Sequence, residues 1–170
     1  NAVSHTAVKG NIPVDQEYSQ TKRDIVGDYR AGTFVSKTVL SSTFQFNRLV
    51  TILKFSVDAT GTELAGDRMR SITFKVNNNR QLSGDFTINL ETQNTTLAAF
   101  AEGNDSLNLT WTDQPMLNSG SEIRAYMTSL PTLQVGDEMT IVITTNNHVA
   151  TLKRPSKVTF AKNGVVTYPL

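Results

Sequence analysis

Apolar and polar residues alternate along most of the chain after residue 70. Side chains on a β-strand point to opposite faces in turn, so a period of two is typical of strands that bury one face and wet the other. Helical periodicity is nearly absent. The alternation predicts strands over residues 71–76, 85–90, 106–111, 122–127, 138–145, 157–160 and 165–170.

Short polar turns separate these segments. Asn146 and Asn147 stand between two strand patterns, and Asn tolerates left-handed backbone angles, so we expect a two-residue hairpin turn there. Lys162, Asn163 and Gly164 are expected to play the same part before the last strand. The close spacing of strands predicts an all-β protein, a Greek-key β-sandwich of about seven to nine strands with little or no helix.

The run STFQFNRLVTILKFSVDA, residues 42–59, changes its parity. Phe44 and Phe46 are apolar on even numbers, whereas Leu53, Phe55 and Val57 are apolar on odd numbers. A β-bulge near residues 47 and 48 would insert one residue and return the later side chains to the first face. Alternatively, residues 49–53 are buried on both faces, as in a central strand covered on each side. We favour one long, bulged central strand.

Residues 1–41 are polar and weakly patterned, with one Pro and three Gly. We expect extended segments and irregular loop there, packed along the sandwich as part of the same domain. Residues 42–170 form the sandwich core in this prediction, and 170 residues suffice to bury a sizeable core. The whole chain would be a single domain, on its own or as the N-terminal domain of a longer precursor.

Composition excludes several classes of protein. The net charge is +1, with Lys and Arg scattered among Asp and Glu, so nucleic acid is not an expected partner. No apolar run approaches the length of a membrane-spanning helix. The absence of cysteine excludes disulfides, thiolate metal sites and thiol nucleophiles. The chain begins at Asn1 rather than Met, and we expect an exported protein that has lost its signal or leading segment.

No set of residues spells out a reaction. His5 and His148 are the only histidines and lack the spacing of a zinc site. The carboxylates occur mostly singly in turns, apart from the adjacent Asp137 and Glu138. Neither a nucleophile elbow nor a phosphate-binding glycine loop occurs. We therefore expect no metal, no cofactor and no enzymatic activity.

Aromatic residues supply the one feature that a sugar-binding site could use. Trp111 and Tyr126 are candidate glycan contacts, because flat aromatic faces stack on the apolar faces of sugars. Trp111 is in phase with Leu107 and Leu109, however, which favours a position in the core. A glycan-binding module of a surface lipoprotein is therefore the alternative function.

Four stretches carry a family resemblance. They are GNIPVDQEYSQTKRDIVGDYRAGTF with its IP-x-x-Q element, the pattern F-x-F-x-R-x-x-x-x-L-K-F-x-V over residues 44–57, SITFKVNNNRQLSGDFTINLET, and the closing SLPTLQVGDEMTIVITTNNHVATLKRPSKVTFAKNGVVTYPL. In this order they resemble the fimbrillin-type proteins of Bacteroidales, which build surface fimbriae. The resemblance covers most of residues 10–170.

The resemblance implies a transthyretin-like β-sandwich, export as a lipoprotein, and adhesion or fimbrium assembly at the cell surface, on the outer membrane. Family members carry a lipid-bearing Cys near the start of the precursor, which proteolysis can remove. This chain would then meet the membrane only through that lost lipid anchor. The implied partners are other fimbrial subunits or the chain itself, and a host or bacterial surface ligand.

Such subunits assemble by strand donation, in which a strand of the next subunit satisfies an open sheet edge and fills an apolar groove. We expect the groove walls or the donated strand in the terminal segment and in residues 49–57. The candidate residues are Leu49, Ile52, Leu53, Phe55, Val165, Val166, Tyr168 and Leu170.

Overall fold

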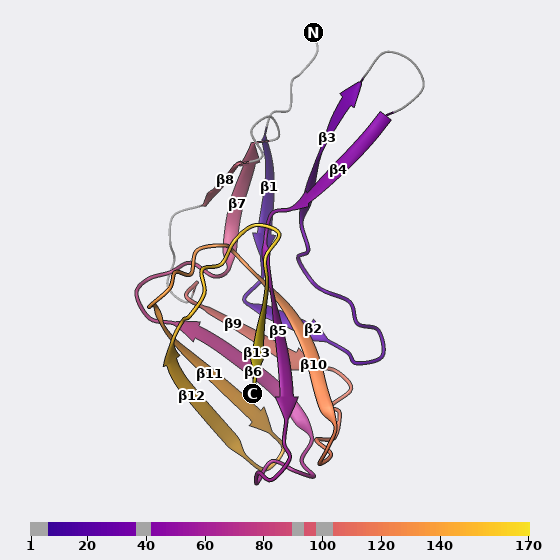
Figure 1. The fold of residues 1–170 in the computed structure, drawn as a ribbon, viewed down its shortest axis with the longest axis vertical. Coiled ribbons are helices and arrows are strands. Elements are labelled where there is room, and N and C mark those ends of the chain that lie inside the picture. Colours follow the sequence, from indigo (N-terminus) through magenta and orange to yellow (C-terminus); the bar gives the residue numbers. More distant parts are fainter. Residues whose placement is uncertain (1–6, 37–41, 90–93, 98–103) are drawn as a thin grey trace.

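The computed structural model describes residues 7–36, 42–89, 94–97 and 104–170. Within these ranges the chain forms thirteen strands and no helix, which confirms the all-β prediction (Figure 1). None of the described residues belongs to a helix of the length and hydropathy that crossing a membrane would need. The strands are β1 (Ala7–Ile12), β2 (Asp15–Tyr18), β3 (Arg30–Ser36), β4 (Ser42–Arg48), β5 (Thr51–Asp58), β6 (Met69–Val76), β7 (Gly84–Asn89), β8 (Asn94–Leu97), β9 (Ser106–Trp111), β10 (Glu122–Ser129), β11 (Glu138–Thr145), β12 (Val149–Pro155) and β13 (Val165–Pro169).

Two sheets form a β-sandwich, as predicted. One sheet has five strands in the order β12-β11-β6-β9-β2, and the other has three in the order β10-β5-β13. Aromatic rings join the layers, because the Phe74 ring of β6 lies 6.3 Å from Phe55 of β5 and 5.5 Å from Tyr168 of β13 between centroids. The eight strands of the two sheets agree with the expected seven to nine, and five further strands lie outside them.

The other five strands extend from one end of the sandwich (Figure 1). They form the three-stranded sheet β1-β7-β8 and the hairpin of β3 and β4. Gly10 of β1 lies opposite Phe86 of β7, and a Cβ at Gly10 would come within 2.4 Å of that ring. Tyr29 packs edge-on against Phe86 with 5.3 Å between ring centroids. The glycine therefore makes room for an aromatic pair that joins this sheet to the chain leading into β3.

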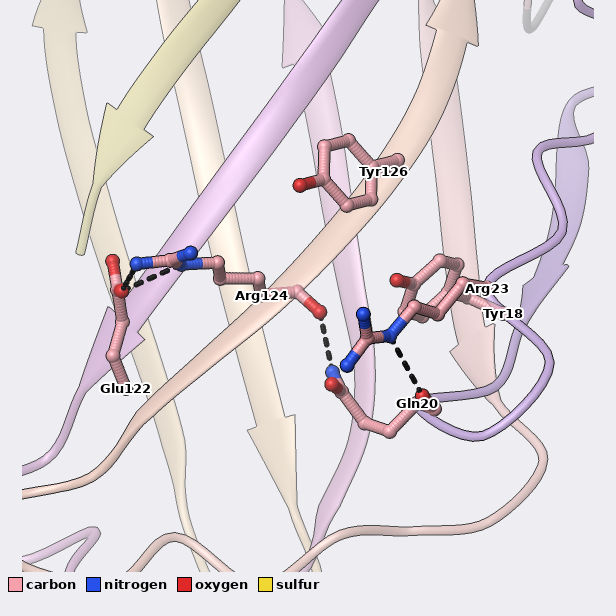
Figure 2. A pocket seen from close by; sticks show the side chains of 6 residues that line it. All are labelled: Tyr18, Gln20, Arg23, Glu122, Arg124 and Tyr126. Atoms are coloured by element: carbon pink, nitrogen blue, oxygen red, sulfur yellow. Dashed lines mark hydrogen bonds and ion pairs between the residues drawn. The ribbon is translucent and has the colours of Figure 1, made fainter.

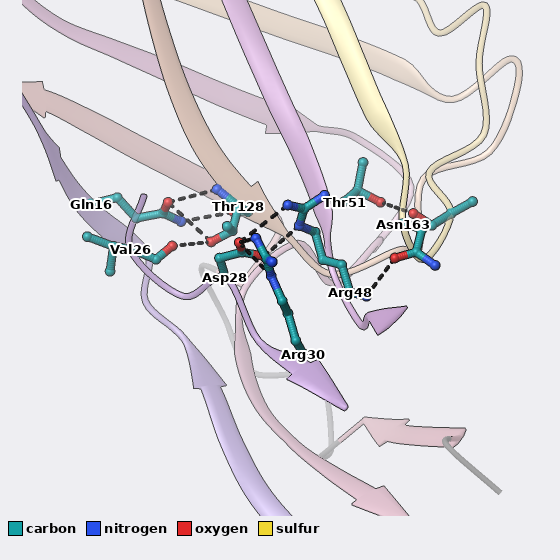
Figure 3. A network of polar contacts seen from close by, with 9 residues as sticks. Gln16, Val26, Asp28, Arg30, Arg48, Thr51, Thr128 and Asn163 are labelled. Carbon is teal, nitrogen blue, oxygen red and sulfur yellow. Dashed lines mark hydrogen bonds and ion pairs between the residues drawn. The ribbon is translucent and has the colours of Figure 1, made fainter. Parts of the chain in front are cut away.

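A carboxylate fastens the base of the β3–β4 hairpin (Figure 3). Asp28 accepts hydrogen bonds from Arg48 Nε at 2.5 Å and from Arg30 Nη2 at 2.7 Å. Burial raises the pKa of Asp28, but the hydrogen bonds from Arg48 and Arg30 outweigh that effect and lower it below the ordinary value. The backbone N–H of Arg48 donates to the side-chain oxygen of Asn163 at 2.6 Å. The ion pairs and this bond tie the end of β4 to the segments before β3 and before β13.

The parity change in residues 42–59 marks two strands rather than one. β4 pairs only with β3, whereas β5 lies between β10 and β13 in the sandwich. The chain passes from one sheet to the other at Leu49 and Val50, which are both buried. Our prediction of one long, bulged strand is therefore wrong, because the two halves face different surroundings. The alternative holds for β5, which is buried on both faces at Ile52 and Leu53.

Two further expectations are corrected. Residues 157–160 do not form a strand, because β12 ends at Pro155 and the Ser156 hydroxyl bonds both the N–H and the carbonyl of Val158. Phe160 is nevertheless buried and stacks on Phe74 with 6.0 Å between centroids. The segment 1–41 also contains more regular structure than expected, since β2 completes the five-stranded sheet.

Asn146 and Asn147 join β11 and β12 in an antiparallel hairpin, as predicted, and the N–H of Thr145 donates to the carbonyl of His148 at 2.9 Å. The expected left-handed backbone is wrong. Neither Asn146 nor Asn147 has a positive φ. Their side chains bond instead to the segment before β6, where Asn146 Oδ1 accepts from Arg68 N at 2.7 Å. Asp67 accepts from Asn147 Nδ2 at 2.7 Å. Contacts to a distant segment thus override the local turn preference of the Asn pair.

Asp67 is the centre of this junction. Its side chain is 6% exposed, and it accepts a hydrogen bond from Thr145 Oγ1 at 2.6 Å. The Nδ1 atom of His148 lies 2.7 Å from Asp67 Oδ2. The Thr145 hydroxyl, followed by His148, lowers the pKa of the Asp67 carboxyl below its ordinary value of 3.8. The charged form is therefore the one that the fold stabilises.

We predict that Asp67→Asn lowers the melting temperature at pH 7 by about 3–8 °C. A carboxyl whose pKa is lower in the folded than in the unfolded protein stabilises the fold at every pH above its unfolded-state pKa. That stabilisation is lost as the pH falls through its folded-state pKa. The gap between wild type and variant should therefore shrink as the pH falls from 5 to about 3. Thermal melts by circular dichroism over this range measure it. The exposed Asp24→Asn is the matched control and should melt with wild type throughout; a gap that stays constant with pH would contradict the prediction.

Candidate functional site

A sandwich of two open sheets has two flanks, where the edge strands of the layers lie next to each other. Here β2 lies next to β10 on the first flank, and β12 lies next to β13 on the second. Edge strands present unpaired backbone N–H and C=O groups, which invite another chain unless they are covered or blocked. The two flanks therefore decide where the sandwich itself can pair with an extended partner.

Two glutamine side chains close the β2–β10 flank, Gln16 (Figure 3) and Gln20 (Figure 2). Gln16 of β2 is 2% exposed, and its Nε2 donates to the carbonyl of Thr128 in β10 at 2.9 Å. Its Oε1 accepts from the N–H of Thr128, also at 2.9 Å. Further along the strand, Gln20 Nε2 donates to the carbonyl of Arg124. Two side-chain amides thus bond the outer edge of β10 as a neighbouring strand would.

The β12–β13 flank is different. Leu170 donates to Ser56 and accepts from Asp58, so its backbone groups point toward β5. By strand alternation, the backbone groups of Val165, Thr167 and Pro169 point away from β5, to the outer edge of β13. No other described strand pairs with that edge.

The residue types of the edge strands strengthen the contrast. β12 ends in Lys153, Arg154 and Pro155, and charged residues and Pro are the usual means of blocking an edge. β2 exposes Asp15 and Glu17. β13 has the sequence VVTYP and carries no charge, and its one Pro, Pro169, is the last residue of the strand. It is the uncharged edge of the sandwich.

An apolar groove lies next to the end of β13. Its volume is about 230 Å³. Asp58 is the one charged residue that lines it. The apolar lining comes from Val57, Leu64, Ile141, Ile143, Ala150, Leu152 and Leu170. An apolar side chain of a partner strand would find a matching surface there.

The structure separates the predicted assembly residues into two groups. Leu49, Ile52, Leu53 and Phe55 are each less than 5% exposed, and β5 is paired on both edges. These four residues are therefore buried, and β5 offers no open edge, so residues 49–57 do not provide a donated strand. Val57 of this range does line the groove. The second group is the terminal segment, which does lie at an edge: Val165 is 55% exposed, Val166 is half-buried, Tyr168 is buried and Leu170 lines the groove.

The two predicted glycan contacts, Trp111 and Tyr126, lie in different environments. Trp111 is 1% exposed, so its ring cannot meet a sugar and the main support for the glycan-binding alternative is removed. It packs edge-on against Tyr18 with 6.4 Å between centroids. Tyr126 is half-buried and lines a pocket on the β2–β10 flank, together with Tyr18, Gln20, Arg23, Glu122 and Arg124 (Figure 2).

Sequence reasoning missed Gln16 and the pocket residues other than Tyr126. Gln16 could have been found from the sequence, because it takes an inward position in the alternating pattern of β2 and is the Gln of the IP-x-x-Q element. The pocket residues could not have been found in this way, since Arg23 and Arg124 come from segments about 100 residues apart and Arg is an ordinary surface residue.

No group of three or more His, Cys, Asp or Glu side chains within the described ranges could hold a metal ion. His148 is engaged with Asp67, and His5 lies outside the described residues. Asp137, which directly precedes β11, accepts from Arg80 Nε at 2.7 Å. This bond lowers the pKa of Asp137 and outweighs the effect of its burial. Asp67 and Asp137 thus serve the structure of loops.

Comparison with known proteins bears on the fold. No family model matches the sequence, and no curated protein matches it. A crystal structure of a candidate cell adhesion protein from Bacteroides ovatus ATCC 8483 is similar, with a TM-score of 0.61 at 13% identity. The match covers 98% of this chain and 55% of that one, so the chain spans about half the length of its structural relative. At this identity the likeness shows a shared fold.

We predict that Gln16→Leu lowers the free energy of unfolding by about 2–4 kcal/mol, because it leaves the N–H and C=O of Thr128 without their partner in a buried place. Urea denaturation at 25 °C measures the change. The exposed Gln134→Leu is the matched control and should change stability by less than about 0.5 kcal/mol. Equal stability of the two variants would show that the amide does not close the flank.

Proposed function

We propose that this protein is a fimbrillin-like structural or adhesive subunit of the bacterial cell surface, and that it assembles by strand pairing along β13. The observation that carries the proposal is the uncharged outer edge of β13 beside an apolar groove. The fold shared with a candidate cell adhesion protein from Bacteroides supports the general role. The fimbrillin-like motifs of the sequence support the more specific role of a fimbrial subunit.

Side-chain hydrogen bonds and charged residues at the other edge strands of the sandwich favour β13 as the place of assembly. Amides of Gln16 and Gln20 bond β10, while charged side chains mark β2 and β12. A partner strand at any of these would have to displace a buried amide or lie next to uncompensated charge. At β13 it would displace no amide and meet no charge on the strand itself, although the guanidinium of Arg154 lies 5.9 Å from the Tyr168 ring.

An extended segment of a second subunit would gain two kinds of contact at β13. Its backbone would pair with the outward N–H groups of Val165 and Thr167 and with the outward carbonyls of the strand. Its side chains would reach the groove beside Leu170 and exclude water from the apolar lining. Backbone pairing supplies affinity, and the groove selects the side chains that fit.

This proposal makes the protein a binding component and not an enzyme. The partners are a second copy of the chain or a related subunit, and the place of action is the outer surface of the cell. Lipid anchoring belongs to the precursor in this proposal.

Thr167→Pro tests the assembly edge. It removes an N–H that points away from β5, so the sandwich is kept while the outer donor is lost. We expect wild type to self-associate at micromolar to submillimolar concentration in sedimentation velocity, and the variant to associate at least about tenfold more weakly.

Lys153→Pro is the matched control, because Lys153 directs its backbone away from β11 at the neighbouring edge in the same way. It should associate like wild type, and both variants should melt cooperatively. Wild type that stays monomeric up to about 1 mM would contradict the proposal. Loss of association in Lys153→Pro alone would move the assembly edge to β12.

A further inference from the structure

The β2–β10 flank holds a pocket of about 380 Å³, on the opposite side of the sandwich from the proposed assembly edge. Tyr126 and Arg124 of β10 form one wall, and Tyr18, Gln20 and Arg23 form the other (Figure 2). The rings of Tyr18 and Tyr126 lie 6.0 Å apart between centroids and are tilted by 56°. Two phenol rings therefore meet at an angle over a space that two guanidinium groups border.

The two arginines of the pocket differ in their ion pairing. Arg124 donates to Glu122 Oε2 at 2.6 Å, and the hydroxyl of Ser56 donates to the other oxygen of Glu122. Both oxygens of Glu122 thus accept a hydrogen bond, and Arg124 is ion-paired with Glu122. Arg23 forms no ion pair with any carboxylate that the structure describes. Its Nε donates only to the carbonyl of Gln20, at 3.3 Å. The pocket thus keeps one unneutralised cation.

The wall that carries Arg23 is held in place from several sides. Ser19 Oγ and the backbone N–H of Gln20 both donate to Asp113 Oδ2, at 3.0 and 2.7 Å. The N–H of Arg23 closes the turn by donating to the carbonyl of Ser19 at 2.9 Å. Arg23 takes a left-handed backbone with φ of 57°, which is uncommon for a residue other than Gly, Asn or Asp. This turn directs the guanidinium back toward Tyr18, as Figure 2 shows.

The aromatic side of the pocket is equally fixed. Tyr18 is 3% exposed and packs edge-on against the buried Trp111. Burial, followed by the neighbouring Tyr126, raises the pKa of Tyr18, so its hydroxyl keeps its proton and can donate a hydrogen bond. Tyr126 is half-buried and presents the more accessible ring.

We infer that this pocket binds an acidic sugar, a uronic or sialic acid residue of a surface polysaccharide or glycan. The guanidinium of Arg23 would hold the carboxylate through paired hydrogen bonds. The ring of Tyr126 would pack against the apolar face of the sugar, and the amide of Gln20 and the Tyr18 hydroxyl are polar groups within reach of its hydroxyls. A neutral sugar would leave Arg23 unpaired and bind more weakly.

This inference is independent of strand pairing at β13, because the two sites share no residue and lie on opposite flanks. It differs from the glycan site expected from sequence, since Trp111 supports the pocket from within the core and does not touch the ligand. Tyr18 and Arg23, which the sequence analysis did not predict as ligand contacts, line this pocket.

Binding can be followed without a label. Trp111 is the only tryptophan of the chain and lies against Tyr18 at the inner wall, so its fluorescence should respond to occupancy. The probes are trigalacturonic acid, a hyaluronan tetrasaccharide and 3′-sialyllactose, each beside its neutral methyl ester. We expect at least one acidic probe to bind saturably with a Kd of about 0.1–1 mM, and its ester at least about tenfold more weakly.

Variants assign the interaction to the pocket. Arg23→Gln should weaken binding of the acidic probe about tenfold and leave the ester unchanged, whereas the exposed Arg70→Gln is the matched control and should bind like wild type. Tyr126→Ala should weaken acid and ester alike, and Tyr126→Phe should keep binding. Absence of saturable binding by all three acids, equal binding of acid and ester, or wild-type affinity in Arg23→Gln would each overturn the inference.

Discussion

The fold depends on how a two-layer sandwich treats its unpaired edges. Each edge strand carries a row of backbone donors and acceptors that must be bonded, blocked or offered to a partner. This protein uses all three solutions. Gln16 bonds β10 from within the core, charged residues mark β2 and β12, and β13 stays uncharged beside an apolar groove. Of the two flanks of the sandwich, only the β12–β13 flank thus keeps an edge strand that no side-chain amide bonds and no charge of its own marks.

Closing the β2–β10 flank also forms the pocket beside Tyr126. Gln16 and Gln20 reach β10 at Thr128 and Arg124, and the side chain of Tyr126 lies on the same strand between these two points. The turn that carries Gln20 brings Arg23 with it. The same short segment after β2 therefore bonds the sheet edge and supplies the pocket wall, so a structural need places a cation beside two aromatic rings.

Much of the sandwich could be predicted from the sequence, because alternation reports burial wherever one face is wet. β6, β9 and β11 lie where the pattern placed them, and alternate residues such as Phe74 and Leu109 are buried. The pattern misled at residues 42–59, because a change of sheet and a bulge produce the same shift in parity. It misled at residues 157–160, where Phe160 is buried by tertiary packing on Phe74 without belonging to a strand. The pocket could not be predicted, since its walls meet only through the closure of the flank.

The pairing of β13 with β5 has a kinetic consequence. Val165 lies opposite Ile52, and Ser129 of β10 lies opposite Thr51, so the three-stranded sheet joins segments far apart in the chain. Folds dominated by such distant pairings have high contact order and fold slowly, on a scale of about milliseconds to seconds. Until the last segment docks, β5 lacks a neighbour on one side and the core beneath Tyr168 is uncovered. We therefore expect the half-folded chain to be the species most prone to aggregate, and chaperoning to matter most before that docking.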